Sequence, residues 1–139
     1  MNSPTIIVLT FFVVWALFLL VLMEVIRAKL VLSREFPANG FSPDNANQSP
    51  FMQRLARAHA NCVEGLPIFG GLMLVAIVTA QTAVTDPLAY VFLAARLAQS
   101  LIHLLSVSAM AVTLRFSAFA VQLVIAIFWS YALLQSLLA

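Results

Sequence analysis

The chain has 139 residues, of which 63% are hydrophobic and only 9% are charged, against roughly a quarter charged in an ordinary soluble domain. Its length is that of one domain, and apolar blocks of around twenty residues exclude a soluble globular protein. The net charge of +2, without a basic cluster, excludes nucleic-acid binding. We predict an all-α, integral membrane four-helix bundle with spans at about residues 5–29, 50–82, 87–107 and 113–138.

The first span, about residues 5–29, is continuously apolar over residues 6–23 and then carries Glu24, Arg27 and Lys29. Eighteen helical residues at ~1.5 Å each reach about 27 Å, nearly one hydrocarbon core. Glu24 and Arg27 stand three residues apart and can pair on the helix surface. An interfacial belt of charge accounts for these three residues adequately.

The second span, about residues 50–82, begins with polar residues in steps of three or four: Arg54, Arg57, Asn61 and Glu64. This spacing places their side chains on one helix face. Only the later part of the helix tolerates lipid, so the polar turns must project to the membrane boundary. Guanidinium groups bind carboxylates and a carboxylate binds an amine, so this face suits a zwitterionic ligand.

Two further residues of the second span have a predicted structural effect. Pro67 lacks a backbone N–H and is expected to bend the helix just after Glu64. Cys62 is the single cysteine, so no disulfide forms within the chain. Cys62 is either a nucleophile or a small buried apolar residue, and its setting in a helix interior favours the second interpretation.

The third span, about residues 87–107, follows a capping signal at Asp86-Pro87. A second polar stripe runs along it in steps of three or four: Arg96, Gln99, His103 and Ser106. An unpaired arginine inside a membrane costs at least ~2.5–3.5 kcal/mol on insertion scales, so Arg96 needs a counter-ion. Glu64 is the only acidic residue well placed to form an ion pair with it. We therefore predict a contact between Glu64 and Arg96. Whether the stripe is a structural network or a functional site stays open.

The fourth span, about residues 113–138, begins near Arg115 and carries Gln122, Trp129 and Tyr131. The two aromatics are expected at the outer membrane interface. The polar content of this span looks too low to hold chemistry. No metal site is predicted anywhere, because the two histidines and one cysteine show no ligand spacing.

The basic residues outside the third span flank the first and third loops, and the middle loop and both termini have none. They are Arg27, Lys29, Arg34, Arg54, Arg57 and Arg115. By the positive-inside rule this places both termini outside and opens the polar face of the second helix to the cytoplasm, where reduced thiols are abundant.

The pattern Arg-Ala-His-x-Asn-x-x-Glu-x-x-Pro-x-Phe, which spans Arg57 to Phe69, resembles the MAPEG family of integral membrane proteins in eicosanoid and glutathione metabolism. The likeness extends to Glu24, Arg27 and Lys29 and to Ala95-Arg96-Leu97 and His103, and so covers most of the chain. It is closer to the microsomal glutathione transferases and their bacterial counterparts than to the leukotriene-forming synthases.

The resemblance implies a homotrimer with glutathione, as co-substrate, bound between adjacent subunits. Within the matching motif, Arg57 would hold a carboxylate, Asn61 a backbone amide or carboxylate, and Glu64 the amine. Arg115 matches the arginine that stabilises the thiolate, because a nearby guanidinium lowers a thiol pKa. The remaining candidates for glutathione binding are Arg96, His103 and Arg27, of which Arg27 would reach a ligand held by the neighbouring subunit.

The chain departs from the family pattern at Gly65, where relatives usually place a tyrosine, and at Gln99 and His103 along the third helix. The function implied is that of a glutathione-dependent membrane transferase or peroxidase, in a bacterial inner membrane, acting on a hydrophobic electrophile that enters from lipid. Two other functions are compatible with the sequence. One is that of a non-catalytic, lipid-binding relative, and the other is that of a small exporter that uses Glu24 as a proton-coupled carboxylate.

Overall fold

The computed structural model describes residues 2–139 and is all-helical over that range. Its elements are α1 (Pro4–Leu32), α2 (Pro50–Gly65), the π-helical segment η1 (Leu66–Gly70), α3 (Gly71–Val78), α4 (Thr82–Leu105) and α5 (Ala109–Leu138). Because α2, η1 and α3 follow one another without a break, they form one rod, Pro50–Val78. Four helices are then long and apolar enough to cross a membrane, which confirms the predicted fold class.

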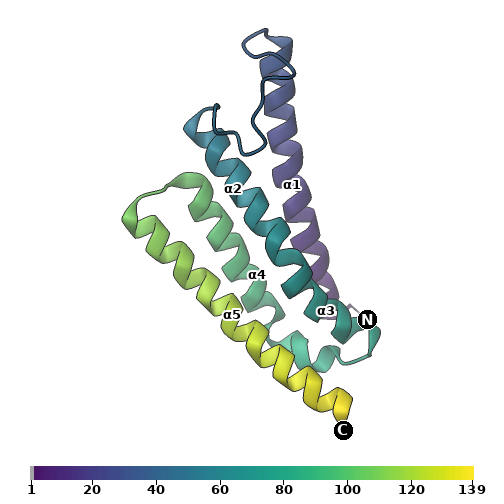
Figure 1. The fold of residues 1–139 in the computed structure, drawn as a ribbon. Coiled ribbons are helices and arrows are strands. Elements are labelled where there is room, and N and C mark those ends of the chain that lie inside the picture. The colour runs from purple at the N-terminus through teal and green to yellow at the C-terminus, as the bar shows by residue number, and fades with distance from the viewer. Residues whose placement is uncertain (1) are drawn as a thin grey trace.

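The four rods run up and down, with α4 and α5 as a helical hairpin beside α1 and the α2–α3 rod (Figure 1). Both termini lie at one end, and the long loop between α1 and α2 lies at the other. Aromatic rings join the rods in the core. The ring of Phe92 on α4 lies 5.8 Å from Phe12, 5.1 Å from Phe69 and 5.7 Å from Trp129, measured between centroids. Each rod therefore contributes at least one ring to the same cluster.

Trp129 belongs to this core and is fully buried, so the prediction that it lies at the outer membrane interface is wrong. Its indole covers Phe92, and burying so large a side chain against other rings outweighs an interfacial position. Tyr131, two residues later on the opposite side of α5, is exposed.

The irregularity expected at Pro67 is the π-helical segment η1, Leu66–Gly70. Proline has no N–H for the α-helical ladder, and a wider turn accommodates the missing bond. Phe69, which this turn carries, is buried between the α2–α3 rod and the other helices.

The third span begins at Thr82, five residues before the predicted residue 87, so Asp86 lies inside α4 and does not cap it. Its carboxylate instead joins the cap of α1, where Ser3 is the N-cap residue and its hydroxyl accepts from the backbone N–H of Thr5 at 3.2 Å. Oδ1 accepts hydrogen bonds from the backbone N–H of Thr5 (3.0 Å), from the Thr5 hydroxyl (2.6 Å) and from the hydroxyl of Ser3. The contact satisfies orphan donors at the start of α1 and ties α1 to α4.

We expect Asp86→Ala to lower the free energy of unfolding by about 1–2 kcal/mol, because the first turn of α1 loses the carboxylate that accepts from Ser3 and Thr5. The corresponding fall in the midpoint of thermal unfolding in detergent is on the order of 3–8 °C. Glu35→Ala, which removes an exposed carboxylate, serves as the control and should stay within about 0.5 kcal/mol of the wild type. An equal loss in both variants would contradict the capping role.

At the opposite end, the loop over residues 33–49 is held by the buried side chain of Asn45. Its Oδ1 accepts hydrogen bonds from Arg27 Nη2 (2.6 Å) and Nε (3.2 Å), and its Nδ2 donates to the carbonyl of Met52 (2.8 Å). Arg27 also pairs with Glu24 at 3.0 Å, as predicted from their spacing. Asn45 thus links the end of α1 to the start of α2.

Candidate functional site

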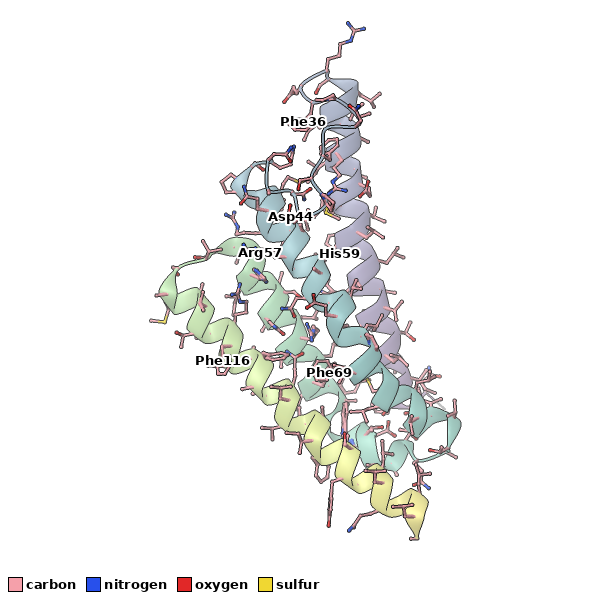
Figure 2. All side chains as sticks on the ribbon, in the orientation of Figure 1. Phe36, Asp44, Arg57, His59, Phe69 and Phe116 are labelled. Carbon is pink, nitrogen blue, oxygen red and sulfur yellow. The ribbon has the colours of Figure 1, made fainter. Side chains whose placement is uncertain are left out.

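A cavity of about 420 Å³ lies between α2, η1, α4 and α5. Its polar lining is Asn61, Glu64, Arg96, Gln99 and Arg115. Its apolar lining is Ile68, Phe69, Val112, Phe116, Phe119 and Leu123. Figure 2 shows Phe69 between the α2–α3 rod and α5, and Phe116 on α5. One cavity therefore has both charged and apolar side chains in its wall, and its volume falls within the range of small-molecule sites.

Arg96 is the central charge of this cavity and is only 1% exposed. Its guanidinium carbon lies 5.1 Å from the ring centre of Phe12 and 5.4 Å from that of Phe69, within cation–π range of both. Nη1 donates to Asn61 Oδ1 at 3.1 Å, whereas Nε and Nη2 have no hydrogen-bond partner in the described chain. Arg96 therefore lines the cavity as a buried cation, while its two unpaired donors are enclosed, with Nη2 against Gly65. A cation in a cavity wall is the arrangement expected of an anion-binding group.

The predicted contact between Glu64 and Arg96 is not formed. The one ion pair found in residues 2–139 is that of Arg27 with Glu24, and Arg96 is bonded to Asn61 instead. Glu64 is one turn further along α2 and is exposed, although it lines the same cavity. Hydration of the carboxylate competes with an ion pair at this position, and the two charges stay apart on the same wall.

A chain of side-chain amides connects α2, α4 and α5 beside Arg96. Gln99 Nε2 donates to Asn61 Oδ1 at 3.3 Å, and Gln122 Nε2 donates to Gln99 Oε1 at 2.8 Å. Gln122 also donates to the carbonyl of Ala118 at 3.2 Å and is fully buried. The fourth span therefore contributes to the site although its polar content is low, because α5 supplies one end of this network and several lining residues. The signal was a glutamine in the middle of an apolar span.

The helix α5 starts at Ala109, four residues before the predicted residue 113, and Arg115 lies in its second turn. It is partly buried and lines the cavity. Arg57 does not line it, and lies exposed one helical turn before Asn61 (Figure 2). Of these two arginines, only Arg115 therefore belongs to the cavity lining.

His103 is buried and does not line the cavity, and its Nε2 has no partner among the residues that the structure describes. Cys62 is fully buried, with Sγ 3.4 Å from the hydroxyl of Ser100, as the interpretation of a small core residue requires. Arg54 donates from Nε to the carbonyl of Leu104 at 2.8 Å and so satisfies the C-terminal turn of α4.

Arg27 does not reach the cavity within one chain. Its guanidinium is occupied by Asn45 and Glu24 and lies over the ring of Phe41, at 5.5 Å from the ring centre. These contacts order the loop after α1. A direct role of Arg27 in ligand binding therefore requires a neighbouring subunit.

The glycine at position 65 gives Arg96 its place. A Cβ built on Gly65 would lie 2.7 Å from Arg96 Nη2 and 3.2 Å from Phe69 Cδ2. A tyrosine at this position therefore cannot coexist with the observed guanidinium. The glycine at position 65 therefore leaves the space in which the buried guanidinium of Arg96 packs.

Comparison with known families gives one match: the model of the MAPEG family aligns with residues 5–135, nearly the whole chain. Searches of curated proteins and of solved structures found no match.

Proposed function

Because this chain belongs to the MAPEG family, we propose that it is a glutathione-dependent membrane transferase or peroxidase acting on a hydrophobic electrophile. One observation carries the proposal. The buried guanidinium of Arg96 lines a cavity that also holds Asn61, Glu64 and Arg115 and that has phenylalanine side chains in its wall. A charged thiol peptide matches the polar lining of this cavity, and an apolar co-substrate matches the apolar lining.

The roles proposed for the polar residues follow from the charges of glutathione, which carries two carboxylates, one ammonium group and a thiol. Arg57 and Arg96 bind carboxylate, Glu64 binds the ammonium group, and Asn61 hydrogen-bonds the peptide. His103 is proposed to support glutathione binding from outside the cavity lining, and Arg27 to bind glutathione held by an adjacent subunit.

The proposed catalytic residue is Arg115. Its guanidinium stabilises the thiolate of bound glutathione, which loses its proton to water, and so raises the fraction of nucleophile at neutral pH. In the transferase reaction the thiolate forms a carbon–sulfur bond and the leaving group departs with its electron pair. In the peroxidase reaction the thiolate attacks the terminal peroxide oxygen, so a glutathione sulfenic acid forms as the O–O bond breaks, and the departing alkoxide takes a proton from water to become the alcohol. The thiol of a second glutathione then attacks the sulfenic sulfur, which gives the disulfide and water.

We expect Arg115→Ala to reduce turnover of a chromogenic aromatic halide with glutathione by at least about 100-fold, which is the scale of removing one transition-state charge contact. The assay follows product absorbance with purified protein in detergent. Lys29→Ala, which removes an exposed cation of α1, is the matched control and should retain turnover. Wild-type protein that binds lipid but never turns over glutathione would contradict the proposal in favour of the non-catalytic, lipid-binding alternative.

We further propose a homotrimer, in which Arg27 of one subunit approaches the cavity of the next. Native mass spectrometry of the detergent-solubilised protein measures the assembly. A monomer that binds glutathione with full affinity would rule out this arrangement.

The proposed location is a bacterial inner membrane with the site facing the cytoplasm. Six of the seven basic residues belong to the end of the bundle that carries the α1–α2 loop and the α4–α5 turn, whereas Asp86 is the charge nearest the two termini. Basic loops are retained in the cytoplasm. We expect an alkaline phosphatase fused after Ala139 to be active, and activity only when it is fused within residues 33–49 would reverse the orientation.

A further inference from the structure

The polar network beside Arg96 has a direction, and we propose that it sets Asn61 as a hydrogen-bond donor toward the cavity, with Gln122 as the positioning residue at the far end. The inference rests on the proposed function for the identity of the ligand, and deepens it. It assigns the ligand group at Asn61 as an acceptor, namely a carboxylate.

Both ends of the network have unambiguous polarity. Arg96 can only donate, so the atom of Asn61 at 3.1 Å from Nη1 is its oxygen. The carbonyl of Ala118 can only accept, so the atom of Gln122 at 3.2 Å from it is the amide nitrogen. The orientation of the two end amides thus follows from groups that cannot reverse.

Gln99, between these ends, is then determined from both sides. Its Oε1 accepts from Gln122 Nε2 at 2.8 Å, and its Nε2 donates to Asn61 Oδ1 at 3.3 Å. Reversing Gln99 would place nitrogen against nitrogen at Gln122 and oxygen against oxygen at Asn61. Gln122 Oε1 has no partner within residues 2–139, but reversing Gln122 would set oxygen against oxygen at two contacts.

The consequence falls on Asn61 Nδ2. Its Oδ1 is occupied twice from the protein side, and no hydrogen bond of Nδ2 is found over the described chain, while Asn61 lines the cavity. The free Nδ2–H groups lie beside the buried guanidinium of Arg96, to which Asn61 is bonded. Free donors beside a positive charge select a carboxylate and disfavour an ammonium group.

A test without ligand uses the side-chain amide NMR signals of ¹⁵N-asparagine-labelled protein in detergent, with the Asn61 signal identified by its loss in Asn61→Asp. We expect the Asn61 amide protons to exchange rapidly with water, because Nδ2 is unbonded, and Gln122→Leu to shift their resonance. Gln135→Leu, the same change at an exposed position of α5, should leave it in place. Slow exchange at Asn61, or no shift on Gln122→Leu, would overturn the network's direction.

A second test uses isothermal titration with glutathione. Asn61→Asp keeps the shape but replaces the donor by an acceptor and neutralises Arg96, so affinity should fall at least about tenfold. Gln122→Leu should weaken affinity by about threefold to tenfold, and adding it to Asn61→Asp should have little further effect. Retained or improved affinity in Asn61→Asp would show that Asn61 offers its oxygen to the ligand. If wild-type protein binds no glutathione, the proposed function fails, and the exchange experiment still decides the inference.

Discussion

Replacing Arg96 with methionine is expected to weaken glutathione binding by about 100-fold while the protein unfolds at a temperature no lower than that of the wild type. The first effect follows from the positive charge that Arg96 places in the cavity wall beside Asn61. A charge-assisted contact between this guanidinium and a ligand carboxylate contributes up to about 3 kcal/mol. That free energy corresponds to about two decades in affinity.

The second effect follows from burial. Arg96 is 1% exposed in the part of a helix that crosses the membrane, and no counter-ion approaches it within residues 2–139. Its desolvation is offset by one hydrogen bond to Asn61 and by the rings of Phe12 and Phe69. Methionine fills similar space without that desolvation, and such replacements of buried charge are often neutral or stabilising. The charge is thus retained at a cost to stability, as expected of a binding residue.

Isothermal titration and thermal unfolding of the same preparation measure the two effects together. Lys29→Met removes an exposed cation and should change neither. If Arg96→Met keeps full glutathione affinity, Arg96 is a structural residue. If Arg96→Met lowers both the unfolding temperature and the affinity, the cation–π contacts of Arg96 outweigh its desolvation, and ligand binding is not its main role.

Adding one methyl group at Gly65 is expected to reduce glutathione affinity at least about tenfold, because Arg96 must leave its position. The new Cβ would stand 2.7 Å from Nη2. A free arginine would move aside at little cost, but this guanidinium lies between two rings and is bonded to Asn61. Its displacement moves the charge in the cavity wall and breaks the bond to Asn61, and the loss of one charge-assisted contact with the ligand corresponds to about one decade of affinity or more.

Gly71→Ala gives a control on the same rod, since a Cβ at Gly71 would meet nothing within 4 Å. There alanine should stabilise the helix by about 0.5–1 kcal/mol and leave binding unchanged. Gly65→Ala should gain less stability than Gly71→Ala and should lose affinity. Equal affinity in the two variants would show that position 65 does not control the site.

Local sequence was sufficient for the four helices, their apolar faces and the polar positions that line the cavity. Runs of apolar residues as long as a bilayer allow only one secondary structure, because a helix satisfies every backbone hydrogen bond within the segment. Steps of three and four along one helix likewise decide which side chains share a face, so Asn61 and Glu64 could be grouped correctly.

Partners across the bundle depend on the relative rotation and height of different helices, which no spacing within one helix contains. Arg96 therefore pairs with Asn61 and not with Glu64, Asp86 caps α1 and not α4, and Gln122 joins the network from a span predicted to be inert. For Arg96 the position is set by packing, because the space at Gly65 admits its guanidinium and the rings of Phe12 and Phe69 lie on it. Composition and periodicity settle which residues face inward, and only the packed bundle decides which of them meet.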